Sequence, residues 1–200
     1  MSGSLTARNK DRTRRELAEA ASRLFAERGY ASTTIQDIVQ AVDVSPRTFF
    51  RYFPCKEDVV IALASFSMDD VLGYVAEHDP DEPLESVLRA TFTELLSTVR
   101  AEPEAARSFQ RTLRETPTLR GRWLEEQRRN RDRLAEALAP WFPGESSPLA
   151  AHLVAGIALV TVDEVMALWA DQPSEPDPLR LLNRAFDLLA GSLLSRVGGK

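Results

Sequence analysis

Apolar residues recur at intervals of three and four along almost the whole chain, and this spacing predicts helices rather than strands. The clearest breaks are rich in Pro, Gly and Asp, at 78–83, 140–148 and 171–178. Between them the pattern predicts about nine helices, and no segment shows the alternation typical of a strand. We therefore expect an all-α protein with an N-terminal three-helix head of helix-turn-helix type and a C-terminal helical bundle.

The segment 33–56 is predicted to form two short helices joined by a tight turn. Ile35 and Ile38 have helical spacing on the first helix, and Thr33 with Gln36 is suited to a capping box at its start. Asp43 interrupts the apolar pattern, and Asp tolerates the left-handed conformation that a tight turn often needs.

The second helix of this segment begins with strong local signals. Ser45 is suited to the N-cap, and Pro46 to the first helical position, where a missing N–H has no cost. Phe49 and Phe53 share one face, which leaves a polar face of Arg, Thr and Tyr side chains. Such a face suits the DNA major groove, where Arg can pair with guanine and Thr can contact a base edge. On spacing alone, a helical hairpin with a solvated basic face is an equally good interpretation.

The same stretch resembles the N-terminal signature of the TetR family of transcription regulators. Two runs carry the resemblance, namely Leu24-Phe25-Ala26-Glu27-Arg28-Gly29-Tyr30 and Thr34-x-x-x-Ile38 with Val44-Ser45-x-x-Thr48-Phe49-Phe50-x-Tyr52-Phe53-x-x-Lys56-Glu57. The match covers roughly the first third of the chain. Asp43 stands where the family usually has Gly. Phe50 stands where it usually has Tyr, so one hydroxyl that can reach phosphate is missing.

The resemblance implies a DNA-binding domain over residues 1–55 and a ligand-binding and dimerisation domain over residues 56–200. Arg47 and Thr48 are our candidates for base contacts, and other polar residues of the hairpin are candidates for phosphate contacts. The full set of candidate DNA-binding residues is Thr33, Thr34, Ser45, Pro46, Arg47, Thr48, Phe50, Arg51, Tyr52 and Lys56. The basic segment Arg8 to Arg15 either follows the phosphate backbone or only solubilises the terminus. We expect residues 1–9 to be irregular.

The last two helices, expected at 149–170 and 179–197, are apolar around much of their circumference. A helix that is apolar on more than one face must be buried on more than one face. They are either the central helices of a monomer or the interface with a second copy. The resemblance implies the second, a homodimer that reads a palindromic operator with half-sites ~34 Å apart.

The resemblance also implies that a small hydrophobic or amphipathic ligand binds the C-terminal bundle and changes the spacing of the two heads. Large apolar residues of the middle helices are candidates to line the site, although a residue of this kind is more often plain core. They are Phe66, Met68, Phe92, Phe109, Trp123, Met166 and Trp169. Asp163 and Glu164 interrupt an apolar helix, so either can hydrogen-bond a ligand or pair with Arg180 or Arg184.

Charge and composition agree with a DNA-binding head on an otherwise acidic protein. The formal net charge is -5, but residues 1–60 carry ten Lys or Arg against eight Asp or Glu. The single cysteine, Cys55, excludes an intramolecular disulfide and is more simply incidental than a redox sensor. We expect a cytoplasmic protein without a signal peptide or membrane span. The longest apolar run, 149–162, is shorter than the ~20 residues that a span needs.

Other classes of function are less well supported by the sequence. The chain has no Gly-rich phosphate loop, no metal-ligand spacing and only two histidines, so we predict no catalytic residue, metal or cofactor. Two further alternatives stay open, namely a helix-turn-helix DNA-binding protein without small-molecule control and a helical module that binds only proteins.

Overall fold

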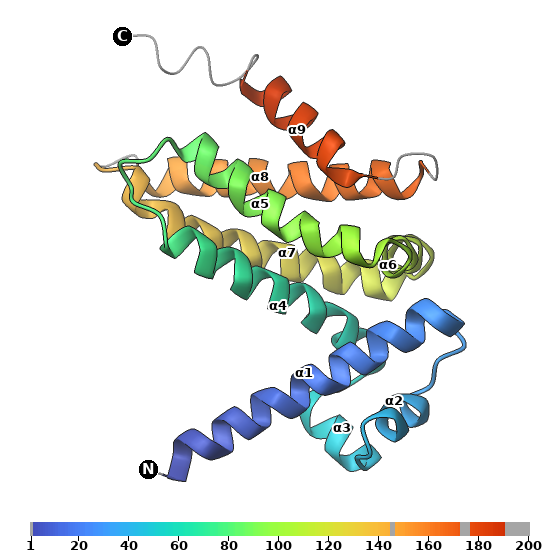
Figure 1. The fold of residues 1–200 in the computed structure, drawn as a ribbon. Helices are drawn as coiled ribbons and strands as arrows, with labels where there is room; N and C mark the ends of the chain where they lie inside the picture. Colours follow the sequence, from blue (N-terminus) through green and yellow to red (C-terminus); the bar gives the residue numbers. More distant parts are fainter. Residues whose placement is uncertain (1, 145–146, 173–176, 191–200) are drawn as a thin grey trace. The chain divides into compact units, whose positions relative to one another are not determined.

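The computed structural model describes residues 2–144, 147–172 and 177–190, except for the side chains of 2–11 and 63–67. In this part of the chain there is no strand, which confirms the all-α prediction (Figure 1). The elements are α1 (Ser2–Arg28), α2 (Ile35–Ala41), α3 (Pro46–Tyr52), α4 (Lys56–Ala76), α5 (Leu84–Ala101), α6 (Pro103–Glu115), α7 (Pro117–Leu138), the 3-10 helix η1 (Ala139–Trp141), α8 (Ser147–Ala170) and α9 (Pro178–Leu189).

The helices form two compact units, and these do not coincide with the segments 1–55 and 56–200. Unit 1 consists of Met1–Phe66 and Glu104–Glu126, and unit 2 consists of Ser67–Pro103 and Gln127–Lys200. Helices α4 and α7 therefore each contribute to both units, while α6 belongs to unit 1. The difference arises because Leu113 of α6 and Leu119 of α7 are buried in the same core as the three N-terminal helices.

The core of unit 1 is built from one stripe of each helix. α1 contributes Leu17, Leu24 and Phe25, and α3 contributes Phe49, which has no exposed surface. The other members of this core are Ala18, Ala21, Ile38, Val39, Phe53, Val59, Val60, Ile61, Ala62, Leu113 and Leu119. Burying a large apolar side chain contributes about 1.5–3 kcal/mol each, so this core is what holds the short helices α2 and α3 in place.

Helix α1 begins earlier than its sequence suggested. It starts at Ser2, so the expectation that residues 1–9 are irregular is wrong. The segment before Leu17 contains no Pro, and helix propagation costs little through residues of good propensity such as Ala, Arg and Lys. At the other end Gly29 has a φ of 83°, a left-handed conformation that favours glycine and ends the helix.

In unit 2, α9 packs against both α5 and α8 (Figure 1). Arg89 of α5 links two of these helices. Its guanidinium donates to Glu85 on the same helix (2.7 Å) and to Asp187 on α9 (2.9 Å), and it lies 5.2 Å from the centre of the Phe186 ring. The hydrogen bond to Glu85, and after it the one to Asp187, raises the pKa of Arg89 above its ordinary value.

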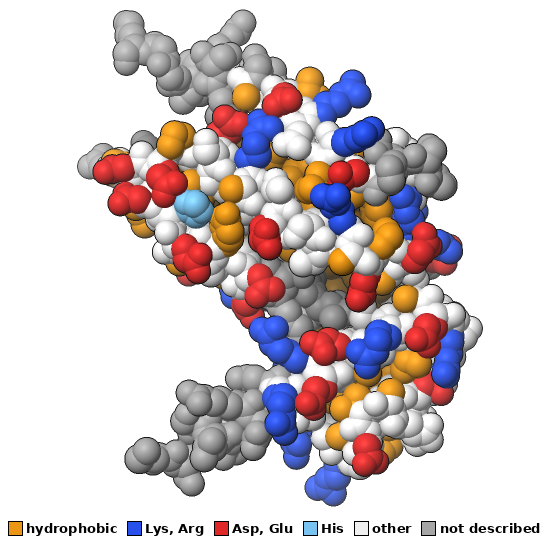
Figure 2. Space-filling model, in the orientation of Figure 1, with side chains coloured by type: hydrophobic (Ala, Val, Ile, Leu, Met, Phe, Trp, Pro, Cys, Tyr) orange, Lys and Arg blue, Asp and Glu red, His pale blue; other side chains and the backbone are white. Residues whose placement is uncertain are grey.

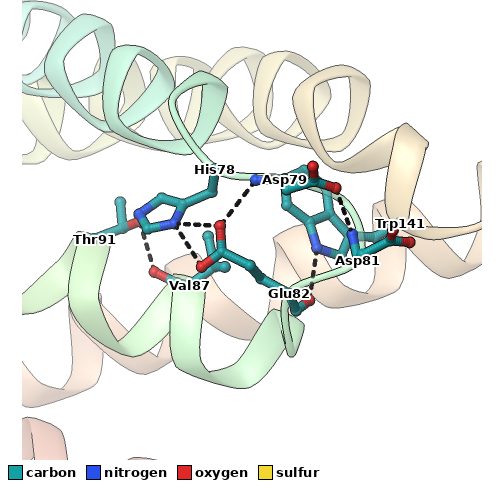
Figure 3. A network of polar contacts seen from close by, with 7 residues as sticks. All are labelled: His78, Asp79, Asp81, Glu82, Val87, Thr91 and Trp141. Carbon is teal, nitrogen blue, oxygen red and sulfur yellow. Dashed lines mark hydrogen bonds and ion pairs between the residues drawn. The ribbon is translucent and has the colours of Figure 1, made fainter.

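The loop between α4 and α5 is held by polar contacts with the end of α7 (Figure 3). The His78 ring nitrogen Nδ1 and the Glu82 carboxylate lie 3.1 Å apart, and the main-chain N–H of Asp79 donates to the same carboxylate at 2.9 Å. The indole N–H of Trp141 in η1 donates to the Glu82 carbonyl at 3.1 Å. The pKa of Glu82 is lowered, chiefly by the Asp79 N–H and then by His78.

Helix α8 is longer than the apolar run that signals it. It has 24 residues and is, by length and composition alone, capable of crossing a membrane. The argument that this segment is too short is therefore wrong, because the helix continues through Asp163 and Glu164 to Ala170. One such helix among the described residues is weak support for a membrane span, since core helices of soluble proteins have the same character.

Candidate functional site

Helix α2 is capped by Thr34 and Asp37, one residue later than Thr33 and Gln36. The Thr34 side-chain oxygen accepts from the Asp37 N–H at 3.2 Å, and the Asp37 carboxylate accepts from the Thr34 N–H at 2.8 Å. These reciprocal bonds form a capping box. Hydrogen bonds from Thr34 lower the pKa of Asp37, so the carboxylate stays charged at the N-terminus of α2.

Thr33 has a different role, and the prediction that it contacts phosphate is wrong. Its side chain is only 1% exposed. Its hydroxyl donates to the Gly29 carbonyl at 2.9 Å, and the Leu24 carbonyl lies 3.2 Å away. Thr33 thus satisfies the free carbonyls at the end of α1 and is withdrawn from the surface.

The turn between α2 and α3 has the predicted chemistry. Asp43 has a φ of 53°, the left-handed conformation expected there. Ser45 caps α3, because its hydroxyl accepts from the Thr48 N–H at 3.1 Å, and Pro46 occupies the first turn. The hydroxyls of Ser45 and Thr48 also lie 3.0 Å apart. The start of α3 is therefore fixed by its own sequence.

Helix α3 has one buried face and one open face. Phe49 has no exposed surface, whereas the Phe50 ring is 53% exposed. The exposed candidates for DNA contact gather on the open face, and they are Ser45, Pro46, Arg47, Phe50 and Arg51, with Thr48 and Tyr52 partly exposed. Arg47 makes no hydrogen bond or ion pair with any described residue. The structure therefore brings seven of the ten predicted DNA-binding residues onto one helix.

Arg51 and Tyr52 are positioned by each other. The Arg51 guanidinium donates to the Tyr52 hydroxyl at 3.1 Å and lies 4.9 Å from the centre of its ring. A cation over an aromatic face is attracted by the ring quadrupole. This pairing orders both side chains on the last turn of α3. The Tyr52 O–H remains able to donate to a further acceptor.

Lys56 is engaged inside the head rather than pointing freely into solvent. Its ammonium donates to the main-chain carbonyls of Tyr30 (2.7 Å) and Thr33 (2.9 Å) and lies 4.0 Å from the centre of the Tyr30 ring. Burial lowers the pKa of Lys56. These contacts tie the start of α4 to the segment between α1 and α2, so Lys56 has a structural role in the head, and its contact with phosphate stays a prediction.

Cys55 lies beside this lysine and has the character of an unreactive thiol. Its sulfur donates to the Asp58 carboxylate at 3.2 Å, and burial raises its pKa to about 11. A thiol with a raised pKa contains little thiolate at neutral pH, and the thiolate is the reactive form.

The basic segment that leads into α1 is helical, but the side chains of Arg8 and Lys10 lie outside the described residues. Arg12 pairs with Glu16 at 3.5 Å, one turn along α1. On the face drawn in Figure 2, Lys and Arg side chains are interspersed with Asp and Glu. Recognition of DNA would therefore depend on local contacts from α3 rather than on a surface of one sign.

The predicted ligand-lining residues divide between the two units. Met68, Phe92, Met166 and Trp169 are buried in unit 2. Phe109 and Trp123 instead pack against the core of unit 1, with ring centres 5.3 Å apart and an edge-to-face angle of 67°. Both lie in unit 1 because α6 and the first half of α7 belong to it, and the role of the whole set in lining a ligand site stays a prediction. The Phe66 side chain lies outside the described residues.

Helix α8 is apolar on two faces, whereas α9 buries Leu182 and Phe186 and exposes one large apolar side chain, Leu188; residues 191–197 of the predicted last helix lie outside the described residues. One face of α8 is buried, through Ala155, Leu159 and Val162. The other exposes four large apolar side chains at three- and four-residue spacing from Leu149 to Val160, a fifth beyond the exposed Glu164, and one more on α9. They are Leu149, Leu153, Ile157, Val160, Leu168 and Leu188, which we call the apolar row. Figure 2 shows apolar side chains at the surface of the face that it draws.

Two polar residues of α7 were missed in the sequence. Asn130 is 2% exposed, and its side-chain oxygen has no hydrogen-bond partner; the same holds for the buried side-chain oxygen of Gln127. Gln127 donates through Nε2 to Asp163 of α8 at 3.1 Å. The segment 125–133 is rich in charge, which by itself favours a solvated face. The available signal was that Asn130 precedes Leu134 and Leu138 at intervals of four.

No group of three His, Cys, Asp or Glu side chains among the described residues is arranged to hold a metal ion. Besides the apolar row, the described residues offer two candidate places for recognition, the open face of α3 and the interior of unit 2. The open face of α3 presents hydrogen-bonding groups to a partner with an extended surface. The interior of unit 2 presents apolar side chains with isolated polar groups.

Comparison with known families identifies both parts of the chain. The family model described as bacterial regulatory proteins, tetR family, matches residues 17–63. The model described as MftR C-terminal domain matches residues 82–194, which is more than half of the chain. The HTH-type transcriptional regulator TcmR of Streptomyces glaucescens is 34% identical over 143 residues, covering 68% of this chain and 62% of that protein. The match thus spans less than two thirds of that relative.

Solved structures have the same fold along nearly the whole chain. The fatty acid degradation regulator FadR from Bacillus halodurans is 25% identical, with a TM-score of 0.62 over 90% of this chain and 95% of that one. The transcriptional regulator FadR from Bacillus subtilis, solved in complex with stearoyl-CoA, is 22% identical, with a TM-score of 0.62 over 89% of this chain and 98% of that one.

Proposed function

Because this chain belongs to the TetR family of bacterial regulatory proteins, we propose that it is a DNA-binding transcription regulator. It acts as a repressor that a mainly apolar small molecule releases from its operator. The proposed activity is binding without catalysis, and it takes place in the cytoplasm. The observation that carries the proposal is the open face of α3, with Arg47, Phe50 and Arg51 exposed around the buried anchor Phe49.

The open face of α3 fits the chemistry of a major groove. Arg47, which makes no contact with the described residues, is proposed to pair with a guanine. Thr48 and the exposed ring of Phe50 are proposed to contact base edges, sugars or thymine methyl groups. Thr34 and the paired side chains Arg51 and Tyr52 are proposed to contact phosphates, which position the helix.

A homodimer follows from the apolar row on α8 and α9. Monomeric proteins rarely expose many large apolar side chains along one helix face, and such a face is suited to a self-complementary interface. Two copies of α3 would then read two half-sites of a palindromic operator, ~34 Å apart.

Ligand control is proposed to act through unit 2, whose buried residues include Met68, Phe92, Met166 and Trp169. A ligand shifts a conformational equilibrium only by its difference in affinity between the two states. Because α4 and α7 contribute to both units, a change in packing within unit 2 acts on helices that also carry core residues of the head.

The experiment that tests this function starts with DNA. Purified full-length protein is used to select from a random duplex library at low salt, with Arg47→Ala as the control variant. We expect wild type to enrich a palindrome with half-sites about one helical turn apart. Failure to enrich any sequence would overturn the DNA-binding role.

Ligand control is tested next with the selected duplex. A thermal-shift panel of apolar compounds, including stearoyl-CoA as one probe, is followed by a DNA-release assay for each compound that raises the melting temperature. A stabilising compound that also releases DNA supports a ligand-responsive repressor. DNA binding that no stabilising compound alters would favour the alternative, a helix-turn-helix protein without small-molecule control.

A further inference from the structure

Asn130 is the polar member of an apolar stripe on the part of α7 that belongs to unit 2. Leu134 and Leu138 follow it at intervals of four, and neither has any exposed surface. Asn130 itself is 2% exposed, so its side chain points the same way, into the interior. Its side-chain oxygen accepts no hydrogen bond. Buried acceptors without a donor are rare in folded proteins and are unfavourable for stability.

Gln127 places a second acceptor next to the first. It precedes Asn130 by three residues, a spacing that puts two side chains on one side of a helix. Its amide nitrogen donates to Asp163 at 3.1 Å, which leaves its oxygen buried and without a partner. Asn130, Gln127 and Asp163 therefore bring two amides and a carboxylate to the part of α7 and α8 that the Gln127–Asp163 hydrogen bond joins.

The surroundings of these oxygens on α8 are apolar. A Cβ added at Gly156 would lie 3.6 Å from Cδ of Arg131, and Gln127 reaches Asp163, so α7 and α8 run antiparallel along this part. Leu159 and Val162 lie between these two points of α8 and are both buried. A ligand group at this place would meet hydrocarbon on most sides and hydrogen-bond acceptors on one.

We infer that the oxygens of Asn130 and Gln127 bind a hydrogen-bond donor of the effector, a hydroxyl or a protonated amine. This inference rests on the proposed function, in which unit 2 binds a mainly apolar ligand. The nearby Asp163 carboxylate favours a donor and disfavours an anionic group at this point. The effector class is thus an apolar alcohol or amine, whose donor satisfies the acceptors that the ligand-free chain leaves open.

The first test separates a binding residue from a structural one. Replacing an unpartnered buried amide by an apolar side chain of similar size removes an unfavourable group. We expect Asn130→Leu to raise the melting temperature of the ligand-free full-length protein by about 2–4 °C. The matched control is Thr91→Val, because Thr91 is equally buried but donates to the Val87 carbonyl at 2.7 Å. A melting temperature that falls in Asn130→Leu would overturn the inference, since it would give the amide a structural role such as holding a buried water.

The second test uses two isomers that differ only in the donor. Octan-1-ol and heptyl methyl ether have the same atoms, but only the alcohol can donate a hydrogen bond. We expect calorimetric titration to show that wild type binds the alcohol about tenfold more tightly than the ether, the worth of one good hydrogen bond. Asn130→Leu should bind both alike, and Thr91→Val should retain the preference.

Three outcomes of the titration would overturn the inference. These are equal binding of both isomers by wild type, an unchanged preference in Asn130→Leu, and no binding of either isomer. Failure of this inference is distinguishable from failure of the proposed function. An effector without a donor that releases DNA from wild type and Asn130→Leu alike would contradict only the role of the amides.

Discussion

The ammonium nitrogen of Lys56 lies 2.7 Å from the main-chain carbonyl oxygen of Tyr30 and 4.0 Å from the centre of its ring. The lysine begins α4, and the tyrosine lies just after the end of α1, 26 residues earlier. Lys56 belongs to the run that resembles the TetR signature, and it also links the end of α1 to the start of α4.

Lys56→Met should lower the stability of the protein, because it removes the charged donor but keeps most of the aliphatic chain. Hydrogen bonds to charged groups contribute roughly 1.5–3 kcal/mol, and we expect a loss in about that range in urea denaturation. Arg47→Ala is the control, since Arg47 makes no hydrogen bond or ion pair with the described residues and should leave stability unchanged. If Lys56→Met kept its stability but bound every DNA sequence more weakly, Lys56 would instead be a phosphate contact.

Arg47→Ala should weaken binding to the selected operator by about 1–3 kcal/mol and relax specificity at one base position. The reason is that a bidentate Arg–guanine pair is lost while the phosphate contacts remain. The measurement is a titration against the operator and against its single-base variants. Equal weakening on all sequences would show that Arg47 contacts the backbone and does not read a base.

Leu153→Glu should dissociate the dimer without unfolding the chain. Leu153 is 56% exposed, so a charge there is hydrated in the monomer but would be buried in the proposed interface. We expect the dimer dissociation constant in sedimentation equilibrium to rise at least about tenfold. Leu124→Glu is the matched control, because Leu124 is 64% exposed but lies on α7, outside the apolar row. Dissociation by both variants, or by neither, would contradict an interface on α8.

Glu82 should make the protein less stable in acid. Its pKa in the folded protein is lowered below the ordinary value of 4.5, chiefly by the Asp79 N–H and then by His78. The stability that ionised Glu82 contributes is therefore complete above the pKa of this group in the unfolded chain. It is lost as the pH falls through the pKa of Glu82 in the folded protein. Between pH 6 and 3 the melting temperature of wild type should fall more steeply than that of Glu82→Gln. If the melting temperatures of the two proteins fell in parallel with pH, Glu82 would not be a source of the acid sensitivity.

Cys55 should react slowly with thiol reagents. Burial raises its pKa to about 11, so at pH 8 the thiolate fraction is well below that of free cysteine, whose pKa is about 8.5. We expect alkylation by iodoacetamide at least about tenfold slower in the native protein than in the denatured chain. Similar rates in the two states would show that the thiol is exposed and unperturbed.

Sequence alone predicted the features that depend on neighbours a few residues apart. The helix periods, the left-handed Asp43 and the cap of α3 by Ser45 are all local. Each follows from the backbone freedom of one residue, from one side chain bonding a nearby N–H, or from the three- and four-residue spacing of apolar positions. The resemblance to one family added the arrangement of a DNA-binding head and a C-terminal bundle.

Only the tertiary structure decided which polar groups are used inside the protein. Thr33 is buried and Thr34 caps α2, a shift of one residue that depends on where the end of α1 lies. Lys56 bonds Tyr30 from 26 residues away, and Gln127 bonds Asp163 from 36 residues away. Such partners are chosen by how distant segments pack. A sequence pattern shows that a side chain is polar, but not which distant carbonyl or amide it will meet when the core closes.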